Sequence, residues 1–174
     1  MNSSRHRLRI ARTVAALPAL ALLIAVTGCS SADDGASVVV PTPDSKVTKL
    51  CQNLDKALPR KVDGLDRDDP GPRSALTAGW GSPAIILRCG VERPAKMLDP
   101  KVAHGDDPAA VGGRVNGVDW LMEKRDDGSY RFTTASRVTY VEFTLPTSLA
   151  EDRDSALVDL APAIKKAIPV GIAD

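Results

Sequence analysis

The sequence contains few aromatic residues, few histidines and few cysteines. Tryptophan, tyrosine and phenylalanine together make up 3% of the 174 residues, which argues against stacking platforms for bases or sugar rings. There are two histidines, and only His104 lies after residue 28. The chain has neither a Gly-x-Ser-x-Gly segment nor a Cys-x-x-Cys pair. These absences remove the usual signals of a serine hydrolase and of a dithiol redox site.

The charge of the chain also excludes a class of partner. The net charge is +1 at pH 7, and residues 1–28 contain four arginines and no acidic residue, so residues 29–174 have a net charge of −3. A weakly acidic domain has no electrostatic attraction for the phosphate backbone of nucleic acid. We therefore expect no nucleic-acid partner. The length after residue 28 suits one domain with one hydrophobic core.

The first 28 residues have the organisation of a bacterial export signal. A basic start is followed by an apolar run over residues 14–26 that is interrupted only by Pro18. A helix of about 13 residues spans roughly 20 Å, which is shorter than the ~30 Å hydrocarbon core of a membrane. The run ends in Gly28-Cys29, and small residues followed by cysteine resemble the lipobox of bacterial lipoproteins.

Cleavage before Cys29 makes its thiol the acceptor of a diacylglyceryl group. The sequence thus predicts a lipid anchor that holds the protein at the cell membrane, on the extracytoplasmic side. Residues 29–44 are then a flexible tether, and residues 45–174 form a single extracytoplasmic domain. The alternatives are an uncleaved membrane anchor and a plain secretory signal with a chance cysteine.

Hydrophobic periodicity predicts two helices. Apolar residues recur with helical spacing on one face of residues 45–58, where Asp44 or the following serine can cap the start and Pro59 ends the helix. The last helix begins at Ser148, and Pro162 within it predicts a kink or a restart. Both helices have one apolar face that needs a partner layer.

Extended runs predict an antiparallel sheet. The strand-like runs are residues 84–90, 118–125, 130–135 and 138–145, and the turn signals Asn116-Gly117 and Asp127-Gly128 lie beside them. The other segments receive no strand: residues 60–73 and 92–113 are interpreted as irregular, 74–78 as one helical turn and 79–83 as a turn of the chain. The fold class is therefore α+β, with an antiparallel sheet of about four strands covered on one face by two helices.

The remaining cysteines predict a disulfide. If Cys29 carries lipid, Cys51 and Cys89 are left in an oxidising compartment, where an even number of thiols usually pairs. Cys51 lies on the apolar face of the first helix, and Cys89 shares a strand face with Leu87, so both point to the helix–sheet interface. The alternative is a metal or redox thiol pair, for which His104 is the one available nitrogen ligand after residue 28.

Three segments resemble those of a known family. They are Ala78-Gly79-Trp80-Gly81-Ser82-Pro83-Ala84-Ile85, Leu87-Arg88-Cys89-Gly90-Val91 and Val115-Asn116-Gly117-Val118-Asp119-Trp120-Leu121. They are similar to hallmark stretches of a family of secreted lipoproteins from GC-rich Gram-positive bacteria, catalogued as domain of unknown function 3515. The resemblance covers most of residues 45–168. It implies export, lipidation and a small envelope domain, and it transfers no catalytic role because the family has no assigned activity.

Two features invite a chemical interpretation that the residues do not sustain. The loop from Asp66 to Gly71 begins like an EF-hand, with acids at its first and third positions, but Pro70 and Thr77 occupy the fifth and twelfth ligand positions. A solvated acidic loop is the better interpretation. His104 lies in a polar loop and is expected to be exposed. The sequence therefore predicts no catalytic residue, no cofactor and no metal site.

Arg88 is the most unusual residue of the predicted sheet. It interrupts an apolar strand on the face opposite Leu87, and a charge in a sheet is usually paired or solvated. Asp119 and Glu142, in other predicted strands, are its possible partners. With Trp80 at the border, Arg88 and Asp119 would form a partner-binding site on the face that the helices leave open. The alternative is a simple cross-strand ion pair, with tryptophan packed in the core.

Two functions follow as hypotheses. The first is a non-catalytic module that binds an envelope protein, a lipid or a cell-wall component. The second is a small cell-envelope hydrolase with a carboxylate site. We favour the first because no base and nucleophile occur together in the sequence.

The export signal generates a prediction about Cys29. Substitution Cys29→Ser removes the thiol that accepts the lipid, so the protein should remain unprocessed or be released from the membrane. Intact-mass analysis of the mature protein checks this. A mature N-terminus at another residue, without lipid, contradicts the lipobox interpretation.

Overall fold

The structure is a computed structural model that describes residues 37–82 and 85–173. The chain separates into two units, residues 1–32 and 33–174, and the second unit is described below. The predicted export signal, Cys29 and most of the predicted tether lie outside the described residues. Within the described part of the chain, every helix is too short or too polar to span a membrane.

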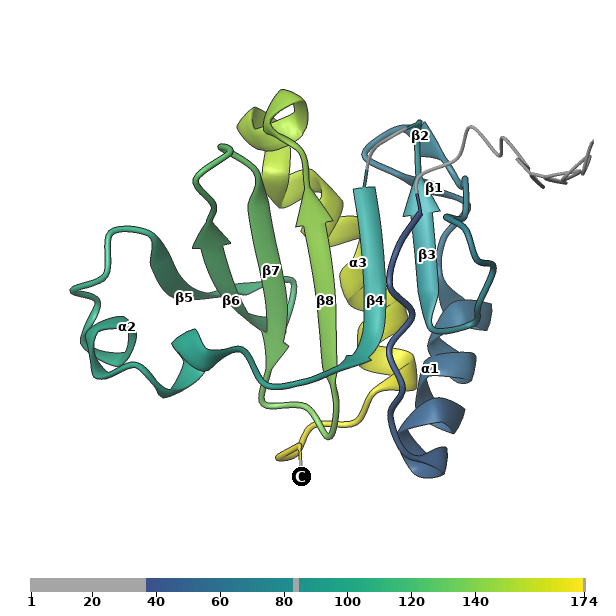
Figure 1. Ribbon diagram of the computed structural model, residues 1–174, viewed down its shortest axis with the longest axis horizontal. Coiled ribbons are helices and arrows are strands. Elements are labelled where there is room, and N and C mark those ends of the chain that lie inside the picture. The colour runs from purple at the N-terminus through teal and green to yellow at the C-terminus, as the bar shows by residue number, and fades with distance from the viewer. Residues whose placement is uncertain (1–36, 83–84, 174) are drawn as a thin grey trace, which may run out of the picture. The chain divides into compact units, whose positions relative to one another are not determined.

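A six-stranded antiparallel sheet forms the centre of this unit (Figure 1). Its order is β3-β4-β8-β7-β6-β5, and a separate hairpin pairs β1 with β2. The strands are β1 (Lys61–Val62), β2 (Leu65–Asp66), β3 (Thr77–Trp80), β4 (Ile85–Val91), β5 (Ala110–Val115), β6 (Val118–Lys124), β7 (Tyr130–Ala135) and β8 (Tyr140–Leu145).

Two long helices cover one face of the sheet, as Figure 1 shows. They are α1 (Ser45–Ala57) and α3 (Arg153–Ala167), which contact each other. The short helix α2 (Pro100–His104) lies beside β5, and two 3-10 turns, η1 (Ala95–Leu98) and η2 (Thr147–Asp152), precede α2 and α3. The predicted mixture of helices with an antiparallel sheet is confirmed.

The hydrophobic core lies between the sheet and the helices. Side chains along β4 alternate, so that Ile85, Leu87 and Cys89 are buried while the residues between them are partly exposed. Phe132 of β7 packs against Phe143 of β8, with ring centroids 5.9 Å apart. Burial of each such large apolar side chain contributes about 1.5–3 kcal/mol to stability.

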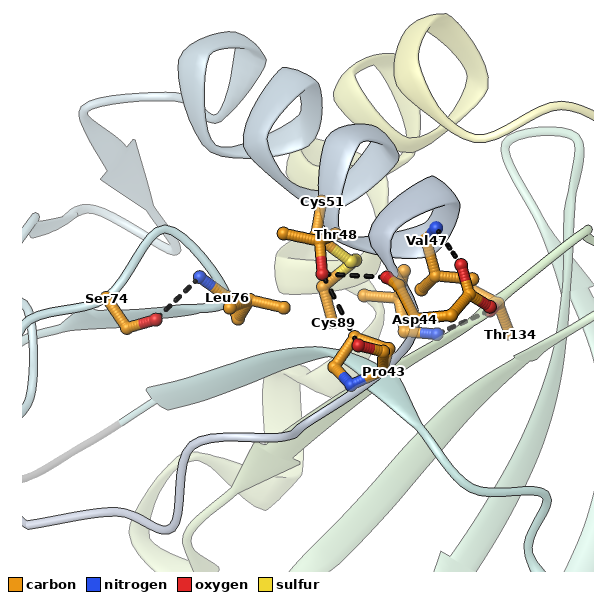
Figure 2. The surroundings of a disulfide bond; sticks show 10 residues. Pro43, Asp44, Val47, Thr48, Cys51, Ser74, Leu76, Cys89 and Thr134 are labelled. Carbon is orange, nitrogen blue, oxygen red and sulfur yellow. Dashed lines mark hydrogen bonds between the residues drawn. A yellow bond between two sulfur atoms is a disulfide. The ribbon is translucent and has the colours of Figure 1, made fainter.

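Helix α1 begins and ends where its sequence indicates. The carboxylate of Asp44 accepts a hydrogen bond from the backbone nitrogen of Lys46 at 2.7 Å. It accepts a second from the backbone nitrogen of Val47 at 3.0 Å, which Figure 2 shows. These bonds satisfy donors that a helix start leaves unpaired. Leu58 takes an extended conformation, and Pro59 follows it.

The sheet has more strands than the about four that we expected from the sequence. Residues 77–80 form strand β3, where we expected a helical turn and a chain turn, because they pair with β4 from Thr77–Arg88 to Trp80–Ile85. Position 79 accommodates only glycine, because a Cβ atom on any other residue would lie 2.4 Å from the carbonyl oxygen of Asp68 and clash with it. Strand β5 was missed because it is an exposed edge strand containing two glycines, which removes the apolar alternation.

Two segments that we interpreted as irregular contain further structure. Residues 60–73 include the β1–β2 hairpin, and residues 92–113 include η1, α2 and the first part of β5. Helix α2 has capping residues at both ends: the Asp99 carboxylate accepts from the nitrogen of Lys101, and Gly105 takes a left-handed conformation. Local caps of this kind are short signals that hydrophobic periodicity does not detect.

A kink or a restart was expected at Pro162, and the restart is wrong. Helix α3 continues from Arg153 to Ala167 with Pro162 inside it. Proline has no N–H to donate to the carbonyl oxygen four residues earlier, which belongs to Val158. The side-chain nitrogen of Asn116 donates to that oxygen instead, at 3.3 Å. A residue from the β5–β6 turn thus compensates for the missing helical hydrogen bond.

Residues 37–44, which we assigned to the tether, lie against the folded unit. The nitrogen of Val38 donates to the carbonyl oxygen of Gly71 at 2.8 Å, and Pro41 is buried. Pro43 packs so closely on Gly90 that a Cβ atom there would lie 2.6 Å from the proline ring. This extended segment, called the strap below, is therefore part of the domain.

The predicted disulfide between Cys51 and Cys89 is present. It joins α1 to β4 in the core, as Figure 2 shows, with Cα atoms 5.6 Å apart. Both residues are buried. The bond fixes the helix to the strand that carries Arg88.

Reduction of this disulfide should lower the free energy of unfolding by about 2–5 kcal/mol, because the bridge limits the freedom of the unfolded chain. Urea denaturation with and without reductant measures the change. The double variant with Cys51→Ala and Cys89→Ala is the control, and its stability should not respond to reductant. Equal stability of the oxidised and reduced protein contradicts a stabilising role for the bridge.

Candidate functional site

Trp80 does not border Arg88, contrary to the sequence prediction. It is fully buried, and its register opposite Ile85 places it on the face that the helices cover. The indole nitrogen donates to the carbonyl oxygen of Pro59 at 3.1 Å. The prediction was wrong because Trp80 belongs to strand β3 and not to a turn. Trp80 is a core residue.

Asp119 is also separated from Arg88. It lies on β6, while Arg88 lies on β4, and strands β8 and β7 stand between them. Its partner is Arg114 in the neighbouring strand β5, with Nη2 and Oδ2 at 3.0 Å. The hydrogen bonds from Arg114 lower the pKa of Asp119. The sequence could not place this pair because β5 was not recognised as a strand.

Glu142, the other acid considered for Arg88, is the partner that the structure brings to it. The two residues are register partners in β4 and β8, and Arg88 Nη1 lies 3.3 Å from Glu142 Oε1. The second oxygen of Glu142 lies 4.0 Å from Nη1 of Arg131 on β7. Glu142 thus stands between two guanidinium groups.

Arg131 extends this arrangement to a fourth strand. It donates two hydrogen bonds to Glu123 on β6, from Nε at 2.9 Å and from Nη2 at 2.8 Å. The bond with Glu123 raises the pKa of Arg131. Arg88, Glu142, Arg131 and Glu123 therefore form a row of alternating charge across β4, β8, β7 and β6, called the charged row below. Sequence reasoning missed Arg131 and Glu123, although both interrupt apolar strands as Arg88 does.

Arg88 retains hydrogen-bonding capacity that the protein does not use. Its side chain is 29% exposed, and Glu142 is its one ionic partner among the described residues. Its Nε atom is buried, and no acceptor in the described part of the chain reaches it. A guanidinium group can bind a carboxylate or phosphate through two parallel hydrogen bonds. Because the unpaired Nε atom is buried, an oxyanion can reach Arg88 only through its terminal nitrogens, one of which faces Glu142.

A groove of about 1300 Å³ lies beside Arg88. Arg88, Glu142 and Arg131 line it, so one end of the charged row forms part of its surface. The other walls come from the strap, the beginning of α1, the segment that follows β4, the segment between β7 and β8, and the C-terminal residues Ile172 and Ala173. The expectation that helices leave the other sheet face open is thus only partly met, because the strap and neighbouring segments enclose this groove.

Arg93 holds one wall of the groove together. Its Nε donates to the hydroxyl of Tyr140 at 2.8 Å, and its Nη2 donates to the carbonyl oxygen of Ala173 at 3.2 Å. The guanidinium carbon also lies 5.9 Å from the centre of the Tyr140 ring. Strand β8 and the C-terminal tail are therefore fixed to the segment after β4.

The other candidates from the sequence do not assemble into a chemical site. His104 is an exposed residue at the end of α2 and does not line the groove. Asp66 pairs with Lys61 at 2.8 Å, and Asp69 pairs with Arg67 at 2.7 Å, so these acids of the EF-hand-like loop have basic partners. Over residues 37–82 and 85–173, no group of three or more metal-ligating side chains is placed to hold an ion.

Comparison with known proteins identifies the family. The model of the family described as "Protein of unknown function (DUF3515)" matches residues 10–172, so the chain belongs to that family. The predicted membership of domain of unknown function 3515 is confirmed. No curated protein and no solved structure matches the chain.

The charged row generates a prediction about stability. Substitution Glu123→Gln leaves the buried end of the row without its charge and should lower the free energy of unfolding by about 1–3 kcal/mol. The matched control is Asp119→Asn, which breaks a more exposed arginine–carboxylate pair on the same strand and should cost less. Urea denaturation of the three proteins decides between them. A larger loss for the Asp119 variant contradicts the importance of the row.

Proposed function

We propose that this DUF3515 family member is a lipid-anchored extracytoplasmic protein that binds a ligand non-catalytically in the groove beside Arg88. The basic and apolar segments before Cys29 support export and lipidation. The disulfide between Cys51 and Cys89 supports an oxidising compartment, because such bonds persist mainly outside the cytosol.

The binding proposal rests on the exposure and the incomplete pairing of the Arg88 guanidinium group. The guanidinium group of Arg88 is partly exposed, lines a large groove and has one carboxylate partner among the described residues. These properties are typical of an arginine that recognises a ligand. A purely structural arginine in a sheet has its donors occupied by neighbouring acceptors. Arg137 illustrates the difference, because it is buried and donates to the carbonyl oxygens of Ile168 and Gly117.

The same geometry favours binding over hydrolysis. A carboxylate that acts as a base or nucleophile needs a lone pair that is free to reach the substrate. Glu123 accepts two hydrogen bonds from Arg131, and Glu142 stands between Arg88 and Arg131. Both carboxylates of the charged row are therefore engaged as ionic partners.

The walls of the groove are held in place before any ligand arrives. The disulfide fixes β4 to α1, and Arg93 fixes the C-terminal tail to β8. Pro43 of the strap packs on Gly90 at the other wall. Such preorganisation reduces the entropy lost on binding and suits a recognition site.

The proposal predicts that the mature protein retains its ligand during gentle purification from its own cells. Native mass spectrometry should show a non-covalent adduct in addition to the N-terminal lipid. Substitution Arg88→Gln should reduce this adduct by tenfold or more, since a hydrogen bond to a charged group contributes about 1.5–3 kcal/mol.

The matched control is Arg114→Gln, which also removes an arginine paired across two strands but lies outside the groove lining. It should leave the adduct intact. Circular dichroism confirms that both variants keep the fold. Equal retention in the Arg88 and Arg114 variants rules out recognition at Arg88.

A further inference from the structure

Three of the four most exposed large aliphatic side chains of the described residues line the groove, and Val170 is the fourth. Val39 of the strap is 76% exposed, Leu98 of η1 is 68% exposed and Ile172 of the C-terminal tail is 85% exposed. All three line the groove, although they come from segments that are far apart in the sequence. Exposed aliphatic groups that converge around a cavity commonly mark a binding site for an apolar ligand.

Arg88 and Arg93 are the positions in the groove where an anion can bind. The lining contains four basic and three acidic residues, and one of the basic residues, Arg131, already pairs with Glu123 outside the lining. One of the acids, Asp44, already accepts hydrogen bonds from the start of α1. Arg93 donates to the neutral oxygens of Tyr140 and Ala173, and within residues 37–82 and 85–173 its charge has no acidic hydrogen-bond partner. A ligand that brings one negative group to Arg88 therefore complements the groove.

A peptide fits this groove less well than an amphiphile does. Strands β4, β8 and β7 are each paired on both sides, so they have no free edge to which a peptide strand could add. The strap contains Pro41 and Pro43, which have no backbone N–H to donate. The polar recognition is thus concentrated at one place, and the rest of the site is aliphatic.

We propose that the groove binds one molecule of a long-chain amphiphile with an anionic head, of the fatty-acid class. The carboxylate binds the terminal nitrogens of Arg88, and the alkyl chain lies against Val39, Leu98 and Ile172. This assignment rests on the proposed function of the groove. A free molecule suits it better than a bilayer surface, because Arg88 lies inside a concavity that a planar array of headgroups does not enter.

The test uses laurate and residues 33–174, the unit that contains every described contact and the whole hydrophobic core. Isothermal titration should show one laurate bound per chain below the micellar concentration. Two probes separate the parts of the ligand: acetate has the carboxylate without the chain, and dodecyltrimethylammonium has the same chain with a positive head. Both should bind at least tenfold more weakly than laurate. Equal binding of laurate and dodecyltrimethylammonium overturns the role of the anionic head.

Variants of the ion pair should change laurate affinity in opposite directions. Arg88→Gln should weaken binding tenfold or more. Glu142→Gln should tighten it, because the carboxylate that competes for Arg88 and Arg131 is neutralised. Circular dichroism and urea denaturation confirm that the Glu142 variant keeps the fold, so tighter binding by a folded variant keeps the test decisive even if the Arg88 variant is unstable. Arg114→Gln is the control and should leave the affinity unchanged.

Variants of the apolar rim test the position of the chain. Leu98→Asp and Ile172→Asp should each weaken laurate binding severalfold, since both side chains are exposed and their loss does not disturb the core. Val158→Asp, at an exposed position of α3 outside the groove lining, should have no effect. Unchanged affinity in both rim variants overturns the proposed course of the alkyl chain.

The outcomes distinguish this inference from the proposed function. If laurate fails to bind while the native adduct still depends on Arg88, the ligand class is wrong and the groove remains the binding site. If laurate does not bind and the native adduct does not depend on Arg88, both proposals are contradicted. If residues 33–174 sediment with phosphatidylglycerol vesicles but do not bind free laurate, the protein binds lipid headgroups at a bilayer surface. That result overturns the inference of a single bound amphiphile.

Discussion

The two faces of strand β4 are the constraint on which the rest of the structure depends. Alternation along the strand sends Leu87 and Cys89 to the helices and Arg88 to the opposite side. The disulfide to Cys51 fixes this assignment, because a shift by one residue would turn Cys89 away from α1 and place Arg88 in the apolar core. The stability of the domain and the chemistry of the groove therefore depend on the same strand register.

The charged row shows how the sheet carries charge on a partly covered face. Each charge has an opposite charge on the next strand, so no member of the row is buried alone. The pairing is uneven, however. Arg131 and Glu123 form a bidentate pair, whereas Arg88 shares Glu142 with Arg131 through longer contacts. The end of the row that lines the groove is the end with unused donors.

Segments that the sequence did not assign make part of the groove. The strap was interpreted as a tether and η1 as irregular chain, because neither has the periodicity of a helix or strand. Their positions depend on contacts with distant residues, such as Pro43 with Gly90 and Val38 with Gly71. Likewise, Asp119 was considered for Arg88 because both interrupt strands, and strand order, which local pattern does not encode, separated them.

The sequence by itself determined the elements whose signals are local. Helix α1, strands β4, β6, β7 and β8, the Asn116-Gly117 turn and the pairing of two cysteines follow from periodicity, caps, turn residues and the parity of thiols. Only the tertiary structure decided that Trp80 is buried and that Glu142 pairs with Arg88. It also decided that exposed aliphatic residues from three segments meet at one groove. These are non-local facts, because they arise from which strands become neighbours and which faces the helices cover.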